Sequence, residues 1–283
     1  MSIPRLSAHI NSFRYPDGTT ALSDIHLEIM RGEFCGILGS NGSGKTTLLK
    51  LLDGMIKDFS GEVTLDGDDI RRLSPRQIYG KVGLVFQNPD DQLFAHSVYE
   101  DVAFGPRNMG FDEAEVRRRV TEALDAVEMT DLAAKDIHNL SYGQKKRVCI
   151  AGLLAMGHEI LLLDEPTAGL DPMGEYRMME LLTRLNRDSG VTIVMATHSV
   201  DLVPVFLSRL HILSRGKLAR SGTPEEVFSN RDELSGVKLR LPYIAELIHQ
   251  LNAGGQIPFK RIPLTVGEAR RDILEAFEQQ RSG

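Results

Sequence analysis

GSNGSGKTT, residues 39–47, comes directly after the apolar run FCGIL at 34–38 and opens the helix-like stretch KTTLLKLLDGM. It matches the pattern G-x-x-x-x-G-K-[ST], with Gly39, Gly44, Lys45 and Thr46 at the specified positions. Between a strand and a helix, such glycines let successive backbone N–H groups turn toward an anion, and the helix adds its positive end. The stretch therefore predicts the phosphate-binding loop of a P-loop nucleoside triphosphatase.

Within this loop, the Lys45 ammonium is expected to reach the outer phosphates and the Thr46 hydroxyl to hold Mg²⁺. The nucleotide-binding residues expected from the loop are Gly39, Ser40, Asn41, Gly42, Ser43, Gly44, Lys45, Thr46 and Thr47.

The composition is that of an ordered globular chain. Its 283 residues are 42% hydrophobic, which allows one large domain or two. A net charge of -6 and only 6% aromatic residues argue against a broad nucleic-acid face, so no nucleic-acid partner is expected. The opening MSIPRLSAHINSF does not read as a secretory signal, and no apolar stretch approaches the roughly 18 residues of a membrane span. We expect a cytosolic chain that meets a membrane only through partners.

Strand and helix patterns alternate along most of the chain. Buried strands are predicted at FCGIL, VGLVF (82–86), ILLL (160–163) and VTIVMA (191–196), with helical patterns between several of them. Such alternation indicates an α/β domain with a largely parallel sheet. Cys35 and Cys149 lie in apolar runs and are expected to be reduced core residues.

Two other regions are predicted to be helical. Residues 97–155 show no strand pattern and are interpreted as a helical subdomain inserted into the α/β domain, which spans 1–225. Residues 226–283 read as a small C-terminal helical extension, whose last helix opens with a capping box at Thr265 and Glu268. Dimer stabilisation is the preferred role of this extension, with regulation or simple covering of apolar surface as alternatives.

Two acids follow the apolar strand ILLL. A carboxylate at the carboxyl end of a parallel strand lies where open α/β sheets bind ligands, so Asp164 is placed to hold Mg²⁺. The next residue, Glu165, points another way and could deprotonate the attacking water.

The stretch LSYGQKKR at 140–147 predicts a second anion cradle, because a serine and a glycine precede a basic helical segment. One nucleotide does not need two cradles in one chain. Both become useful if two chains face each other and each closes the other's site.

At this point residues 5–225 resemble the ATP-hydrolysing subunits of ABC transporters. Gln87 resembles the glutamine of the family's Q-loop, Asp171 in GLDP its D-loop, and His198 in ATHS its switch histidine. Tyr15 stands where an aromatic usually stacks on adenine. The resemblance implies ATP as substrate, Mg²⁺ held by Thr46, Gln87 and Asp164, and catalysis by Glu165, His198, Gln87 and Asp171.

One residue departs from the family's commonest signature, which has glycine where this chain has Tyr142. Ser141, Gly143 and Gln144 are kept, so their contacts with the phosphates are expected to survive. The variant, together with NPDDQLF at 88–94 and VDLVPV at 200–205, resembles the energy-coupling-factor branch, and within it the cobalt or nickel uptake ATPases.

The resemblance implies a homodimer, although some relatives pair two different ATPases. Its partners would be an integral-membrane coupling protein and a substrate-capturing membrane protein, with the chain peripheral on the cytoplasmic face of the cell membrane. One hypothesis is that Asp90 and Asp91 receive a basic coupling helix of that partner. A vitamin remains the alternative cargo. A non-transport ATPase in DNA repair or translation is disfavoured because the chain has one P-loop and no sustained heptads.

Overall fold

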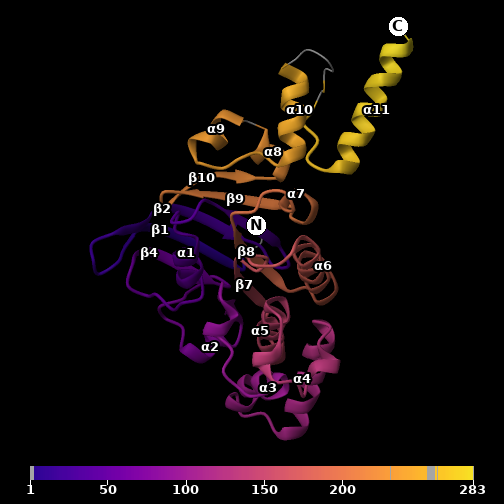
Figure 1. Ribbon diagram of the computed structural model, residues 1–283. Helices are drawn as coiled ribbons and strands as arrows, with labels where there is room; N and C mark the ends of the chain where they lie inside the picture. Colours follow the sequence, from indigo (N-terminus) through magenta and orange to yellow (C-terminus); the bar gives the residue numbers. More distant parts are fainter. Residues whose placement is uncertain (1–2, 230, 254–258, 260, 283) are drawn as a thin grey trace.

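The computed structural model describes residues 3–229, 231–253, 259 and 261–282. At its centre lies a six-stranded sheet in the order β10-β9-β3-β8-β7-β6 (Figure 1). Its strands are β3 (Phe34–Leu38), β6 (Val82–Val85), β7 (Ile160–Asp164), β8 (Thr192–Thr197), β9 (Arg209–Ser214) and β10 (Lys217–Gly222). All neighbours are parallel except β9 and β10, so the predicted largely parallel α/β sheet is confirmed.

A second, antiparallel sheet has the order β2-β1-β4-β5. Its strands are β1 (Leu6–Arg14), β2 (Thr20–Ile29), β4 (Ser60–Leu65) and β5 (Asp68–Asp69). The sequence analysis missed this sheet. Its strands alternate buried and exposed residues, as in β2, because one face packs on the core and the other meets solvent. The apolar runs that marked the central strands are therefore absent from it.

Helices cover the central sheet and form one end of the molecule. They are α1 (Lys45–Leu52), α2 (Pro75–Tyr79), α3 (Val98–Asn108), α4 (Glu113–Ala126), α5 (Tyr142–Met156) and α6 (Pro172–Ser189). Short 3-10 helices lie at Pro89–Asp91, Thr130–Leu132 and Ile137–Asn139. Residues 97–155, all of them described, contain no strand, only one isolated bridge between Ser97 and Asp136.

The C-terminal region is helical, and Figure 1 places α10 and α11 at the end of the molecule opposite α3 and α4. Its elements are α8 (Pro224–Phe228), α9 (Arg231–Gly236), α10 (Tyr243–Ala253) and α11 (Val266–Ser282), whereas the short α7 (Val203–Phe206) lies before β9. The predicted capping box is present, since Glu268 N–H donates to Thr265 Oγ1 at 3.3 Å and Thr265 N–H to Glu268 Oε2 at 3.3 Å. Among the described helices, none has the length and apolar character that crossing a membrane requires.

Two apolar cores hold these layers together. One fills the space between the central sheet, α1 and the antiparallel sheet, and the other lies between the central sheet and α3 to α6. Cys35 and Cys149 are buried and free, as predicted, one in each core. The P-loop leaves β3 between these cores, at the carboxyl edge of the parallel strands.

Candidate nucleotide site

The P-loop needs its glycines for two different reasons. A side chain on Gly39 would run into Ser43 Oγ and the Leu213 carbonyl oxygen, so the turn closes only without one. Gly44 has φ +106° and stands directly before the first residue of α1. That left-handed conformation is one that side chains rarely adopt. The first N–H groups of α1 are thereby presented at the loop.

Lys45, Glu165 and His198 form a charged cluster beside this loop. Glu165 Oε1 lies 3.4 Å from Lys45 Nζ and 2.9 Å from His198 Nδ1. Lys45 Nζ also donates to the Gly39 carbonyl at 2.8 Å. Lys45 and Glu165 are buried, whereas the His198 side chain is 54% exposed. A carboxylate held between a buried ammonium and an imidazole at the cleft is well placed to accept a proton from water.

Glu165 reaches this position through an uncommon backbone conformation. Its φ is +49°, and its N–H donates to the Ala196 carbonyl at 2.9 Å. A positive φ is uncommon in a glutamate and costs free energy. The turn sends Asp164 and Glu165 to different places, as the sequence analysis predicted for adjacent residues.

Asp164 and Thr46 form the group that could hold Mg²⁺. Thr46 Oγ1 donates to Asp164 Oδ2 at 2.6 Å, and Asp164 Oδ1 is buried with no hydrogen-bond partner among the described residues. Burial raises the pKa of Asp164, while the Thr46 hydrogen bond and Lys45 oppose the rise. An unpaired buried carboxylate oxygen next to a hydroxyl is the hard-oxygen donor set that Mg²⁺ prefers. These residues therefore fit the ion.

The cleft above the loop has a volume of about 640 Å³. Of the predicted site residues, those that line it are Tyr15, Asn41, Gly42, Ser43, Gly44, Lys45, Thr46, Thr47, Gln87, Asp164 and Glu165. The Tyr15 hydroxyl lies 2.9 Å from Thr47 Oγ1, and its ring packs edge-on against Phe13. Cleft residues that sequence reasoning missed are Thr19, Thr20, Ala21, Arg215 and Gly216. Thr20 and Ala21 lie in β2 and Thr19 directly precedes it, while Arg215 and Gly216 form the turn between β9 and β10. None of these three strands was predicted from the sequence.

The signature residues lie outside this cleft. Ser141 caps α5, since its Oγ accepts from Gln144 N–H at 3.3 Å and Gln144 Oε1 accepts from Ser141 N–H at 3.0 Å. With Gly143 they border a separate open hollow of about 370 Å³. Within one chain, these residues and the P-loop do not form one site.

Two acidic residues already have partners inside the chain. Asp171 caps α6, accepting from Gly174 N–H at 2.6 Å. Asp90 Oδ1 lies 2.6 Å from Lys145 Nζ on α5, which weakens the hypothesis that Asp90 receives a basic helix of another protein.

Lys146 is a residue at the site that the sequence analysis did not single out. It is almost fully buried, and its Nζ donates to the carbonyl oxygens of Glu165 at 2.6 Å and Ala168 at 2.9 Å. Burial lowers its pKa to about 8. Nothing in the run KKR separates this buried lysine from its neighbour Lys145, because both lie in one basic segment.

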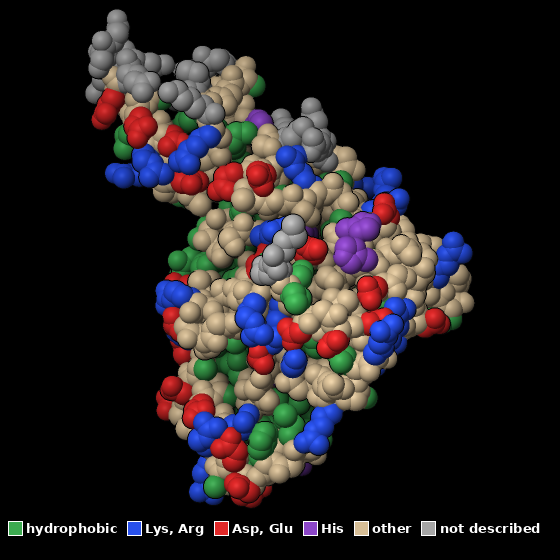
Figure 2. All heavy atoms as spheres, turned by 180° about the vertical axis from the view of Figure 1, so that it is seen from behind, with side chains coloured by type: hydrophobic (Ala, Val, Ile, Leu, Met, Phe, Trp, Pro, Cys, Tyr) green, Lys and Arg blue, Asp and Glu red, His purple; other side chains and the backbone are tan. Residues whose placement is uncertain are grey.

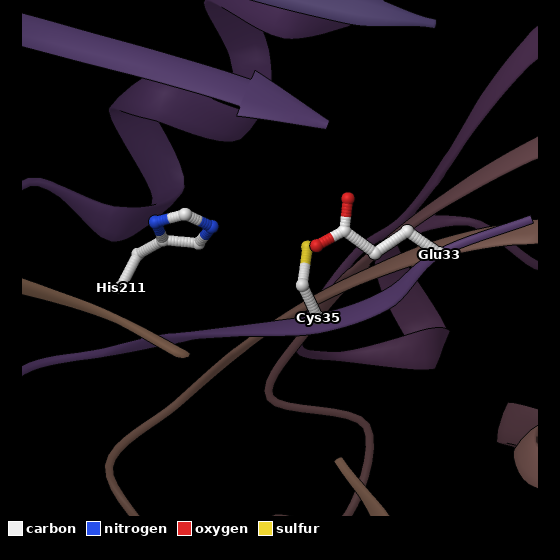
Figure 3. Close-up of side chains that lie close together, drawn as sticks. All are labelled: Glu33, Cys35 and His211. Carbon is white, nitrogen blue, oxygen red and sulfur yellow. The ribbon is translucent and has the colours of Figure 1, made fainter. Parts of the chain in front are cut away.

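A second group of potential ligands, Glu33, Cys35 and His211, lies away from the cleft where β3 meets β9 (Figure 3). His211 Nε2 points toward the other two, and it is buried without a partner in the described part of the chain. However, burial raises the pKa of the Cys35 thiol and lowers that of His211 to about 4. Glu33 accepts from Met30 N–H at 2.7 Å and faces Arg209 at 3.7 Å. A cation would have to displace the thiol proton and compete with Arg209, so we interpret the group as core packing.

Comparisons with known proteins show the family to which the chain is similar. A family model described as ABC transporter matches residues 22–168. The chain is 70% identical over 278 residues to a putative ABC transporter ATP-binding protein of Geobacter sulfurreducens, covering 98% of this chain and 100% of that one. It is 48% identical over 270 residues to the energy-coupling factor transporter ATP-binding protein EcfA of Methanocaldococcus jannaschii, covering 95% and 96%.

Solved structures show the same fold. The structure of cbiO1 from Clostridium perfringens, part of the ABC transporter complex cbiONQ, matches with a TM-score of 0.76 and 43% identity. The match covers 87% of this chain and 99% of that one. A dimeric post-hydrolysis state of the ATP-binding cassette MJ0796, bound to ADP and Pi, matches with a TM-score of 0.68 and 29% identity over 77% and 98% of the two chains.

Proposed function

Because the chain belongs to the ABC transporter ATP-binding family and is an ATPase, we propose that it is the energy-coupling subunit of a membrane importer for cobalt or nickel ions. One observation carries the ATP-hydrolysing part of the proposal: Glu165 Oε1 lies within 3.4 Å of both Lys45 Nζ and His198 Nδ1 at the wall of a cleft built on the P-loop. A nucleotide-binding regulator without turnover would not need this arrangement of base, cation and imidazole.

Hydrolysis in this cleft depends on positioning and electrostatics. The N–H groups of the P-loop and Lys45 hold the phosphates, Tyr15 stacks on adenine, and Glu165 accepts a proton from the attacking water. His198, 2.9 Å from Glu165, orients that carboxylate and contacts the γ-phosphate. Thr46, Asp164 and Gln87 would hold Mg²⁺, which when bound neutralises phosphate charge.

The separated signature supports a homodimer. Ser141, Gly143 and Gln144 border an open hollow away from the chain's own cleft, so they suit the ATP held by a second copy. Asp171, exposed at the start of α6, would then link the two sites. The dimer would close when it binds ATP and open after hydrolysis, and this movement would drive transport. In this proposal the ATP-binding domain spans residues 1–225, with its helical subdomain at 97–155, and the C-terminal extension spans 226–283.

The membrane partner is proposed to dock at the α2–α3 end of the molecule. There Phe94 and Phe104 are 65% and 48% exposed, with ring centroids 4.6 Å apart. Tyr79 and Met109 line a nearby hollow of about 260 Å³ between α2 and the helical part. Figure 2 shows apolar side chains at the surface toward this end of the molecule, among charges of both signs. Exposed aromatic side chains of this kind are typical of protein interfaces. The chain would thus sit peripherally on the cytoplasmic face of the cell membrane, beside a coupling protein and a capture protein.

The cargo is the finer part of the proposal. Cobalt or nickel is favoured because LSYGQKKR and NPDDQLF resemble the uptake ATPases for those ions, and a vitamin is the alternative. The cargo would be bound by the capture protein, not by this chain. A non-transport role in DNA repair or translation is a third possibility that the same experiment tests.

The test is affinity capture from native membranes with the tagged full chain carrying Glu165→Gln, in MgATP, followed by mass spectrometry. Recovery of a coupling protein with a metal-type capture protein would support the cobalt or nickel importer, and a vitamin-type capture protein would change only the cargo. Recovery of ribosomal or DNA-associated proteins alone would overturn the transport role.

Matched variants locate the docking surface. Phe94→Ser combined with Phe104→Ser should lose the membrane proteins. Val205→Ser on α7, where the side chain is 50% exposed, should retain them. Equal recovery from all variants would place the docking surface elsewhere.

A further inference from the structure

Tyr142, the residue that departs from the common signature, touches two other loops of the site. Its hydroxyl donates to the Gln87 carbonyl oxygen at 3.0 Å. Its ring packs against Gly169, where an added Cβ would lie only 3.0 Å from the ring atom Cε1. The side chain therefore contacts the segment that follows β6 and the segment that precedes α6.

Lys146 continues this contact one turn further along α5. Its ammonium lies 5.1 Å from the centroid of the Tyr142 ring and donates to the carbonyls of Glu165 and Ala168. Residues four apart share one helix face, and a cation over an aromatic ring is attracted to it. Burial and the nearby Asp90 and Asp91 raise the pKa of Tyr142, so its hydroxyl stays a donor at neutral pH. One face of α5 thus holds the backbone of Gln87, Glu165 and Gly169 at once.

This arrangement matters because of which ATP each loop serves. Resting on the proposed function, Gln87 and Glu165 act on the ATP bound by the chain's own P-loop. Ser141, next to Tyr142, contacts the ATP of the second copy. Tyr142 contacts the backbone of Gln87, and Lys146 on the same helix face contacts that of Glu165, so together they can transmit the state of one site to the other.

We propose that Tyr142, supported by Lys146, is a positioning residue that couples the two ATP sites of the dimer by tying Gln87 and Gly169 to the signature helix. Tyr142 does not touch the reacting atoms; it acts through the backbone of the residues that do. Packing alone is the competing explanation, because a half-buried tyrosine contributes to stability wherever it lies.

The experiment measures ATP hydrolysis against ATP concentration for the full-length wild-type dimer and for Tyr142→Phe, Tyr142→Gly and Tyr243→Phe. Two sites set an upper limit of about 2 on the Hill coefficient, and a coupling of the usual size corresponds to about a fivefold or larger difference between the two affinities. We expect a Hill coefficient above 1 for the wild type. Tyr142→Phe, which loses only the bond to Gln87, should lower it, and Tyr142→Gly should bring it to 1.

The control Tyr243→Phe removes a hydroxyl from a ring that is 70% exposed on α10, and should keep the wild-type curve. A structural role alone would lower Tm and kcat at an unchanged Hill coefficient, and that result would overturn the coupling role. A wild type that hydrolyses ATP without cooperativity would also overturn it. A wild type that does not hydrolyse ATP would instead defeat the proposed function. If Tyr142→Gly does not fold, Tyr142→Phe still decides.

Discussion

The chain contains two anion cradles of similar chemistry but different completeness. The P-loop runs from β3 into α1 and sits against buried Lys45, Asp164 and Glu165 in a cleft of about 640 Å³. The signature opens α5 with an exposed serine, beside an open hollow of about 370 Å³ that is bordered by Glu128, Arg147 and Arg177. The first cradle has a lysine and two acids buried against its loop, whereas the second lies at an exposed helix start, where the nearby Glu128 is paired with Arg147 and Arg184. The difference fits the proposed dimer, in which the second cradle would complete a site together with ATP held by another chain.

Glu165→Gln removes the charge that we propose makes the first cradle catalytic, and it carries the largest expected effect. Hydrolysis should slow by about 10² to 10⁴, the usual contribution of a general base, while ATP binding persists. Turnover by the purified full chain measures the rate, and equilibrium binding of labelled ATP measures the affinity. Glu180→Gln, on the exposed side of α6, serves as control. Near wild-type hydrolysis by the Glu165 variant would mean that another group activates the water.

Ser141→Arg tests the second cradle in the same way. A bulky side chain on the donor surface should lower hydrolysis by about 10² to 10³, the effect of losing a preorganised donor, while ATP binding to the monomer survives. Loss of ATP binding would show that the signature belongs to the chain's own cleft.

Ser74→Arg is a matched control for that variant. Ser74 caps α2 with the same reciprocal capping box, made with Gln77, so both variants lose a helix cap of about 0.5–2 kcal/mol. Only the Ser141 variant should lose hydrolysis. An equal loss in both would attribute the effect to helix capping.

The two cradles also differ in how much the sequence could predict. The P-loop, Asp164 and Glu165 could be assigned because parallel strands end at one edge of a sheet, so their neighbours in space follow from the fold class. The partners of Tyr142 could not, because Gln87 and Gly169 meet α5 only through the packing of the helical part. The antiparallel sheet was missed because alternating strands with one solvated face give a weaker signal than buried runs. No local sequence feature distinguishes the buried Lys146 from its neighbour Lys145.

Helices α1 and α5, which begin at the two cradles, end in different ways. The difference leads to the smallest predicted effect, a change in stability with pH. Helix α5 ends at Gly157 in a left-handed conformation, whereas α1 ends at Asp53, which is buried. Burial raises the pKa of Asp53 to about 7, against about 3.9 in an unfolded chain. The folded state therefore binds the proton more tightly, so the contribution of Asp53 to stability is fully present below about pH 4. It is lost as the pH rises toward 7.

Asp53→Asn should accordingly stabilise the chain at pH 8 and flatten the dependence of unfolding free energy on pH between about 4 and 7. The expected gain at pH 8 is about 2–4 kcal/mol, because each pKa unit corresponds to about 1.4 kcal/mol and the amide does not recover all of it. Urea unfolding at pH 5 and pH 8 measures both quantities, with exposed Asp58→Asn as control. Equal pH dependence in wild type and Asp53→Asn would show that Asp53 is ionised in the folded chain at little cost. Helix α1 would then tolerate a buried negative charge at its C-terminal end, and the ends of α1 and α5 would differ only in backbone geometry.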